Sequence, residues 1–382
     1  MNNVAELIGV PAPTLWEPID KQQSFDCTNP ELVVGVEIET ERCENIVYTD
    51  RLSKLWQMKT DGSLRGTAFE FVSKPVKIKY LIPQLAKFYA DTGFTDENYS
   101  DRCSVHVHTN ITNLSVEQVS SICLVYSIVE ELLFNFVNKY KAKNEWGYSR
   151  DTNIYCVPWS QCRMNHGVVK NMFADPNYAF RNWQKYTALN LLPAREIGTL
   201  EWRHMHGTAD VDKLTKWLNI IGSIVKYAQG RTLDEVIQVV KELNDSSAYQ
   251  QFYNEIFQDA LPYTEEYSTA IYAGVVNAKY ALMGFSNEDK AKLKKLHKRK
   301  KATLDILAEA ANLGQVEFVD ARVPRFPDQV LRGAGVAFNA ADWRQVPGRL
   351  VEGQRMNEAV RQQAGGGWQA RMEQQYNDED AE

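Results

Sequence analysis

Residues 31–41 read ELVVGVEIETE and alternate between apolar and polar positions as a β-strand does. Because successive side chains point to opposite faces of a strand, Glu37 and Glu39 share one face with Gly35. The other face is apolar and carries Val34, Val36 and Ile38. Two neighbouring carboxylates repel each other, which lowers stability unless a cation or hydrogen-bond donors offset the repulsion. For this strand alone, a solvated acidic face is the simpler interpretation, since charged residues usually lie in water.

Later segments repeat this pattern of ionisable residues at alternate positions. Residues 61–66, DGSLRG, predict a hairpin turn, and the strand that follows it (68–76) carries Glu70 on one face. Residues 103–115, CSVHVHTNITNLS, predict another strand, whose polar face carries His106 and His108. Each of these strands has an apolar opposite face, so we expect them to lie in one sheet above a common core.

Two more strands are predicted at 186–193, YTALNLLP, and at 198–208, GTLEWRHMHGT. In the second of these, alternation places three residues on one face, namely Glu201, Arg203 and Met205. The opposite face carries Leu200, Trp202 and His204. A same-face ion pair between Glu201 and Arg203 would contribute little to stability if it were exposed.

If these strands are neighbours, their shared face is a pocket of four glutamates, two imidazoles and one guanidinium. Such a concentration of carboxylates raises some pKa values unless divalent cations lie among the oxygens. Mg²⁺ prefers oxygen ligands and usually carries substrate phosphates with it. The Arg203 guanidinium offers a fork that matches a phosphate or a carboxylate. These residues together predict a nucleoside triphosphate site that has no glycine-rich loop.

The fold class predicted from these patterns is α+β, with an antiparallel sheet that has helices on one face and a polar, concave other face. Helical periodicity is seen at 78–91, after Ser115 with a capping box to Gln118, and at 211–228 after Asp210. The expected organisation is an extended arm, a catalytic domain, a helical region and a low-complexity tail, with the respective ranges 1–30, 31–230, 231–312 and 313–382. The tail is rich in Gly, Gln and Arg and is expected to be mobile or ordered by a protein partner.

The 382-residue composition is that of a globular protein, with a formal net charge of −6. This charge argues against general nucleic-acid binding. Six cysteines without CxxC spacing indicate reduced thiols, and the chain start does not read as a secretion signal, so a cytoplasmic location is expected. No apolar run reaches about 18 residues, because Glu130 and Glu131 interrupt the nearest one, so no membrane span is expected.

Five segments in order, namely GVEIE, DGSL with FEFVSKP, CSVHVHTN, YTALNLLP and GTLEWRHMHGT, resemble the phage and bacterial amidoligase family. That family belongs to the carboxylate–amine ligases with the fold of glutamine synthetase and glutamate–cysteine ligase. The resemblance covers about residues 31–230 and implies ATP- and Mg²⁺- (or Mn²⁺-) dependent amide formation through an acyl phosphate. The implied substrates are a carboxylate and an amine, in a peptide, the cell wall or a protein side chain. For a phage-encoded chain the location would be the host cytoplasm, or the virion.

The resemblance also implies roles for individual residues. The metal ligands would be Glu37, Glu39, Glu70, Glu201 and His106. Catalysis would depend on Glu37, Glu201 and Arg203, with Arg203 on the transferred phosphate. Nucleotide binding would use His106, His108, Asn190 and Arg203, and Asp61 fits a further motif position. The basic loop that would bind the acid substrate is not evident, and the arginines that could supply it are Arg102, Arg163, Arg181 and Arg195.

Three alternatives stay open at this stage. A His-x-His pair on a strand also suits zinc, which would indicate a zinc hydrolase. A ligase-like fold could instead serve as an assembly or partner-binding component, which the tail at 313–382 would favour. The basic block 289–301 is interpreted as a solvated helix face rather than a nucleic-acid contact, because acidic residues flank it. The aromatic residues between 146 and 186 are interpreted as packing rather than a ligand cage.

Overall fold

The computed structural model describes residues 3–18, 24–44, 52, 54–139, 149–258, 260–264, 266–295 and 298, and the structural statements below concern these residues. The chain divides into two compact units, Met1–Ala302 and Thr303–Glu382, and the described residues lie in the first. The predicted tail, 313–382, and the end of the basic block lie outside the described residues. The domain boundaries proposed from the sequence therefore stay predictions.

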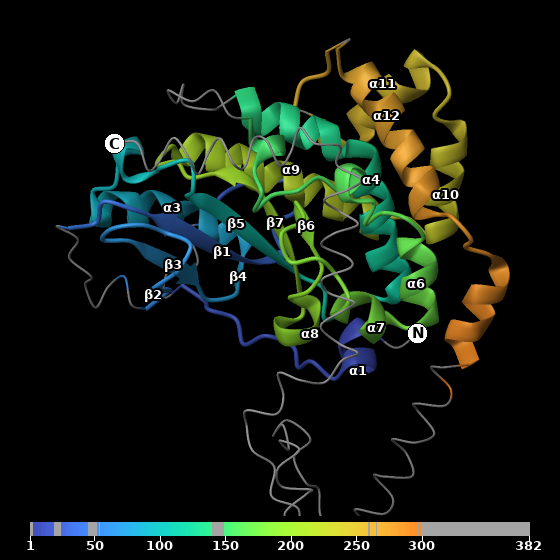
Figure 1. The fold of residues 1–382 in the computed structure, drawn as a ribbon, viewed down its shortest axis with the longest axis horizontal. Helices are drawn as coiled ribbons and strands as arrows, with labels where there is room; N and C mark the ends of the chain where they lie inside the picture. The colour runs from blue at the N-terminus through green and yellow to red at the C-terminus, as the bar shows by residue number, and fades with distance from the viewer. Residues whose placement is uncertain are drawn as a thin grey trace, which may run out of the picture. The chain divides into compact units, whose positions relative to one another are not determined.

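The centre of the first unit is a seven-stranded antiparallel sheet (Figure 1). Six strands follow one another in the order β2-β3-β1-β5-β7-β6, and β4 also pairs with β1. The strands are β1 (Val33–Thr40), β2 (Trp56–Lys59), β3 (Phe69–Ser73), β4 (Val76–Lys77), β5 (Ser104–Asn110), β6 (Leu189–Asn190) and β7 (Thr199–His206). The prediction of an antiparallel α+β fold is confirmed at this level of detail. The predicted strand at 186–193 is reduced to the two residues of β6.

The described helices lie around this sheet. The long ones are α3 (Ile78–Thr92), α4 (Val116–Lys139), α9 (Val211–Gln229), α10 (Leu233–Glu242), α11 (Ser246–Phe257) and α12 (Glu266–Ala281). The short ones are α1 (Val4–Ile8), α5 (Trp159–Cys162), α6 (Val168–Ala174), α7 (Pro176–Arg181), α8 (Ala194–Ile197) and the single turns η1 (Asp96–Asn98) and η2 (Arg150–Thr152). Residues 287–295 are also helical. The arm that was expected to be extended thus contains α1, which Asn3 caps and Gly9 ends.

Helix ends follow the capping signals in the sequence. The amide of Gln118 donates to Ser115 Oγ, and the Gln118 side chain accepts from the Ser115 amide, which forms the predicted capping box of α4. Asp210 accepts from the Lys213 amide at the start of α9. These two helices therefore begin where the sequence predicts.

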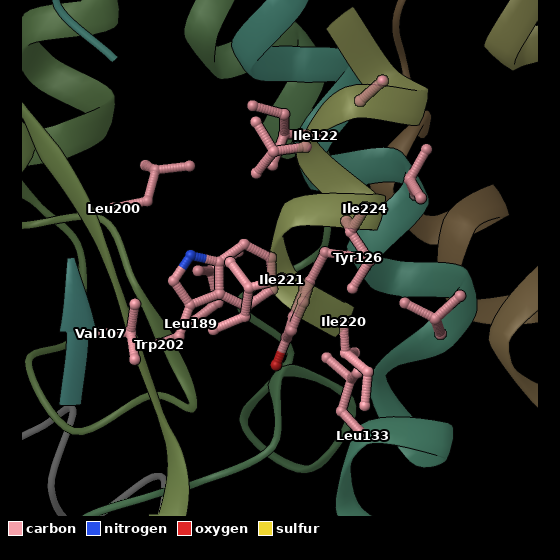
Figure 2. Packing of buried hydrophobic residues seen from close by; sticks show 14 of the residues in the cluster. Val107, Ile122, Tyr126, Leu133, Leu189, Leu200, Trp202, Ile220, Ile221 and Ile224 are labelled. Carbon is pink, nitrogen blue, oxygen red and sulfur yellow. The ribbon is translucent and has the colours of Figure 1, made fainter. Parts of the chain in front are cut away.

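The apolar face of the sheet packs against α4 and α9. Cross-strand pairing aligns the buried side chains of Phe71, Ile38, Val105 and Met205 with the partly buried Met58. Figure 2 shows the next layer, where Ile220, Ile221 and Ile224 of α9 lie between the strands and α4. Trp202 of β7 points into this layer and is fully buried. One face of the sheet is thereby closed by helices, which leaves the other face to carry the polar residues.

A second helical layer packs on α4. Helix α12 crosses α4 so closely that a Cβ atom at Gly274 would lie 1.7 Å from the carbonyl oxygen of Ile128. Helix α10 also contacts α4, and α11 contacts α9. By length and composition α4 could cross a membrane, but 89% of its apolar window is buried inside the protein, as in the core helix of a soluble fold. The absence of a membrane span stays a prediction.

One sequence prediction about a face is wrong. Val105 pairs with Met205 and Val107 pairs with Trp202, so β7 has two residues, Arg203 and His204, where β5 has only His106. This β-bulge adds one residue to β7 and shifts everything after it to the opposite face. Met205 consequently lies in the apolar row rather than beside Glu201 and Arg203.

Candidate functional site

The predicted ionisable residues lie on one face of five neighbouring strands. In one cross-strand row, Gly35, His108, Glu201 and Asn190 are successive partners across β1, β5, β7 and β6. In the next row Glu37 is the partner of His106, and in a third row Glu39 is the partner of Glu70. Paired residues point to the same side of a sheet. The structure therefore brings together all eight site residues that the sequence analysis assigned.

The two histidines lie between carboxylates. His106 Nδ1 lies 3.3 Å from Glu37 Oε2 and 3.3 Å from Glu201 Oε1. His108 Nε2 lies 3.2 Å from Glu37 Oε1, and its Nδ1 lies 2.9 Å from Thr199 Oγ1. Both rings are buried, so these polar contacts replace the hydrogen bonds that each imidazole would form with water. The arrangement joins β1, β5 and β7 through one connected set of side chains.

Glu201 and Arg203 form a buried ion pair on β7, in which Arg203 Nη1 donates to Glu201 Oε1. Asn190 Nδ2 donates to the other carboxylate oxygen, Oε2, at 2.6 Å. Arg203 Nε donates to the carbonyl oxygen of Tyr155 at 2.9 Å, and the guanidinium lies 5.9 Å from the centroid of the Tyr186 ring. Four contacts thus fix the orientation of these two side chains before any ligand binds.

A second group of carboxylates lies toward the β2 edge of the same face. Ligand oxygens of Glu39, Asp61 and Glu70 lie within 4.8 Å of one another. Asp61 belongs to the turn between β2 and β3, where its Oδ1 accepts from the Ser63 amide at 2.6 Å. The turn predicted at 61–66 therefore places Asp61 beside the strand carboxylates.

Electrostatics differ between the two ends of this face. Burial alone would raise the pKa of Glu37, but the imidazoles of His108 and His106 outweigh it and hold this pKa well below its usual value. Burial also opposes ionisation of Glu201, and Arg203 with the histidines lowers its pKa in the same way. Burial, followed by repulsion from Glu37 and Glu39, raises the pKa of Glu70 to about 8. Glu70 therefore keeps its proton at neutral pH, and a cation bound beside these carboxylates would favour its ionised form.

The donor set fits divalent metal ions. One group consists of Glu37, His108 and Glu201, and the other of Glu39, Asp61 and Glu70, each with ligand atoms within 4.8 Å of one another. The second group offers only oxygen, which suits Mg²⁺, Ca²⁺ or Mn²⁺, whereas the first also suits a transition metal. Sequence analysis assigned His106 as a ligand, but the structure places His108 in a group and His106 between the two groups.

Some functional candidates were not found from the sequence. Thr199 holds His108 in place, and Tyr155 and Tyr186 flank Arg203, with their rings 5.3 Å apart. The Thr199 hydroxyl lies within the GTLEWR segment, but nothing in the pattern of that segment indicates a contact with His108. The two tyrosines belong to the aromatic group that was interpreted as packing, and that interpretation describes Trp159 better, which is fully buried.

The four arginines that could bind the acid substrate lie outside the strands that carry the site. Arg163 ends α5, Arg181 ends α7 and Arg195 lies in α8, whereas Arg102 precedes β5. In the described part of the basic block, Lys290 pairs with Asp234, and Lys292 pairs with Asp289. All six cysteines are free.

No protein-family model matches this chain, and no curated protein matches it in sequence.

Proposed function

We propose that this protein is an ATP-dependent carboxylate–amine ligase that forms an amide bond through an acyl phosphate. The observation that carries the proposal is the convergence of two potential cation sites and one preorganised arginine on a single sheet face. Phosphoryl transfer from a nucleoside triphosphate needs cations at the phosphate oxygens and a positive group at the transferred phosphoryl. The resemblance to the amidoligase family supports the same reaction class.

The proposed reaction has two steps. A substrate carboxylate attacks the γ-phosphate of ATP and releases ADP, which leaves an acyl phosphate. An amine then attacks the acyl carbon, phosphate leaves, and the amine loses a proton. Neither step requires a nucleophile from the protein, which agrees with a face that carries carboxylates, imidazoles and a guanidinium.

The chain's own residues have separate roles in this proposal. Glu39, Asp61 and Glu70 would hold one Mg²⁺ or Mn²⁺, and Glu37, His108 and Glu201 a second. When bound, these ions would neutralise phosphate charge and orient the triphosphate. Arg203, held by Glu201 and Tyr155, would stabilise the transferred phosphoryl group. Asn190 holds Glu201 from the other side.

A zinc hydrolase is the weaker candidate. The His-x-His pair does not act as a two-histidine ligand set here, because His106 Nδ1 faces Glu37 and Glu201 while only His108 joins a ligand group. The all-oxygen group of Glu39, Asp61 and Glu70 is also unsuited to zinc selectivity. Mg²⁺ or Mn²⁺ is therefore the better match.

The test is trapping of the acyl phosphate. Hydroxylamine converts acyl phosphates into hydroxamates, so the purified protein would be incubated with ATP, Mg²⁺, hydroxylamine and a panel of carboxylic acids and peptides. We expect ADP and hydroxamate in equal amounts with at least one acid. Glu39→Gln and Arg203→Lys should abolish both products. Glu196→Gln and Lys241→Gln, which replace exposed residues, should not. If the protein binds neither Mn²⁺ nor an ATP analogue, the proposal is wrong.

A further inference from the structure

Arg203 lies on the polar face at the bulge in β7. Opposite His106, β7 has both Arg203 and His204, and only the first of them faces the carboxylates. His204 points the other way, where its Nε2 lies 3.2 Å from the Tyr126 hydroxyl and its ring lies 5.4 Å from that of Trp217. A β-bulge disrupts the ladder locally, so the backbone of these two residues needs other partners.

Arg150 supplies those partners from outside the sheet. Its Nε donates to the carbonyl oxygen of His204 at 3.0 Å, and its Nη2 donates to the carbonyl oxygen of Arg203 at 2.8 Å. The same Nη2 donates to Ser104 Oγ on β5 at 2.6 Å. One guanidinium thus joins the two bulged residues of β7 to the neighbouring strand.

The chemistry of these contacts argues for a geometric role. Arg150 is buried, with 6% of its surface exposed, and the acceptors of its three hydrogen bonds are neutral groups. Among the described residues no carboxylate forms an ion pair with Arg150, and burying a guanidinium without such a partner costs stability. What the contacts provide instead is a rigid, planar fork that fixes two successive carbonyl groups.

The segment that carries Arg150 also contacts the Arg203 side chain. The carbonyl oxygen of Tyr155 accepts from Arg203 Nε, and the Arg203 amide donates to the carbonyl oxygen of Ala188 at 2.8 Å. The backbone of Arg203 is therefore fixed by Arg150 and Ala188, and its side chain by Tyr155 and Glu201.

We infer that Arg150 is a positioning residue, which holds the β7 bulge so that Arg203 projects onto the polar face at the place where an anionic group would bind. The part of this inference that concerns nucleotide binding rests on the proposed function. The part that concerns the orientation of Arg203 does not, because it follows from the bulge and its hydrogen bonds alone.

The test compares Arg150→Gln with Arg181→Gln, which replaces an exposed arginine on α7. The first measurement is the ¹H–¹⁵N signal of Arg203 Nε, assigned with Arg203→Lys. We expect Arg150→Gln to shift this signal and speed its exchange with water at least tenfold, while Arg181→Gln leaves it unchanged. Arg150→Lys and Ser104→Ala, which keep part of the contact set, should give smaller changes and decide the question if Arg150→Gln does not fold.

The second measurement is binding of the non-hydrolysable analogue AMP-PNP and of Mn²⁺. We expect Arg150→Gln to weaken AMP-PNP at least about tenfold, since small misplacements of a binding group have effects of this size. Mn²⁺ binding to the Glu39, Asp61 and Glu70 group, identified as the site lost in Glu70→Gln, should not change, because that group lies at the other end of the face.

The outcomes separate the two proposals. An Arg203 signal in Arg150→Gln that is identical to wild type would overturn the inference. So would an equal loss of Mn²⁺ at the remote group, because that would indicate a general structural role. If wild type fails to bind AMP-PNP but the Arg203 signal responds as expected, the proposed function fails and the positioning role stands.

Discussion

Glu39 and Glu70 lie directly opposite each other in the antiparallel ladder between β1 and β3. Like charges in this position destabilise a sheet. Glu39 is buried, and burial together with neighbouring carboxylates raises the pKa of Glu70 to about 8. Ionisation of Glu70 therefore meets electrostatic repulsion at the point where a divalent cation would remove it, as expected for a binding site rather than a structural one.

The first prediction concerns Glu70 and pH. In the folded protein Glu70 keeps its proton up to about pH 8, whereas in the unfolded chain it loses it near its ordinary value. The folded state thus binds more protons between these two values, so stability falls as pH rises through this range. Without divalent ions, Glu70→Gln should remove about 1–2 kcal/mol of that fall, allowing for partial exposure. Urea unfolding at pH 5 and pH 8 in EDTA measures it.

The control for this measurement is Glu196→Gln, which replaces an exposed carboxylate and should keep the wild-type pH dependence. Adding Mg²⁺ at pH 8 should stabilise the wild type more than Glu70→Gln. An equal pH dependence of stability in wild type and Glu70→Gln would show that Glu70 is not strained by its neighbours.

The second prediction concerns His204, which lies behind the site. Burial, and then the nearby Arg150, lower the pKa of His204 to about 3. Between that value and its ordinary one the unfolded chain binds a proton that the folded protein does not, so stability falls as pH falls. The slope from this group is up to about 1.4 kcal/mol per pH unit. His204→Phe should flatten the fall in unfolding free energy between pH 6.5 and pH 4.

The matched control is His166→Phe, at a half-buried histidine that stacks on Tyr280. It should keep the wild-type acid dependence. If His204→Phe and wild type lose stability in parallel over this range, His204 is not the residue that resists protonation.

Alternation along the chain predicted most of the site. In β1, β3 and β5 the polar face follows from period two alone, because these strands pair without interruption and helices cover their apolar face. Glu37, Glu70 and His108 therefore lie where the pattern places them. The order of the strands in the sheet was assumed in the sequence analysis, and the pairing supplies it.

The sequence pattern could not show the bulge. Residues 199–206 alternate without a visible break, yet Met205 lies on the apolar side because β7 gains one residue opposite His106. The side chain that binds the bulged residues lies far away in the sequence, because Arg150 donates to their two backbone carbonyls. Backbone acceptors are the same in every residue, so no local motif marks the arginine that binds them.

The third prediction concerns the packing of α12. Because a Cβ atom at Gly274 would lie 1.7 Å from the Ile128 carbonyl oxygen, Gly274→Ala forces α12 away from α4. Overpacking of this kind costs about 2–3 kcal/mol, which would appear as a lower urea midpoint. Val276→Ala, at an exposed position of the same helix, should change the midpoint little. A tolerated Gly274→Ala would mean that the two helices lie further apart than described.

The fourth prediction concerns Thr199, whose hydroxyl oxygen lies 2.9 Å from His108 Nδ1. Partners on the far nitrogen of a ligand histidine set its orientation, and their loss typically lowers metal affinity about 10- to 100-fold. Thr199→Val keeps the shape and the strand preference of the side chain, so it should weaken Mn²⁺ binding to the Glu37, His108 and Glu201 group by at least about tenfold without loss of folding.

Thr199→Ser keeps the hydroxyl and should bind nearly as wild type. The group of Glu39, Asp61 and Glu70 contains no histidine, so its Mn²⁺ affinity should be the same in both variants. Calorimetric titration with Mn²⁺ measures the affinities of the two groups. Equal affinities in the valine and serine variants would show that His108 is not oriented by this contact, and would favour His106, which lies between the two groups, as the ligand.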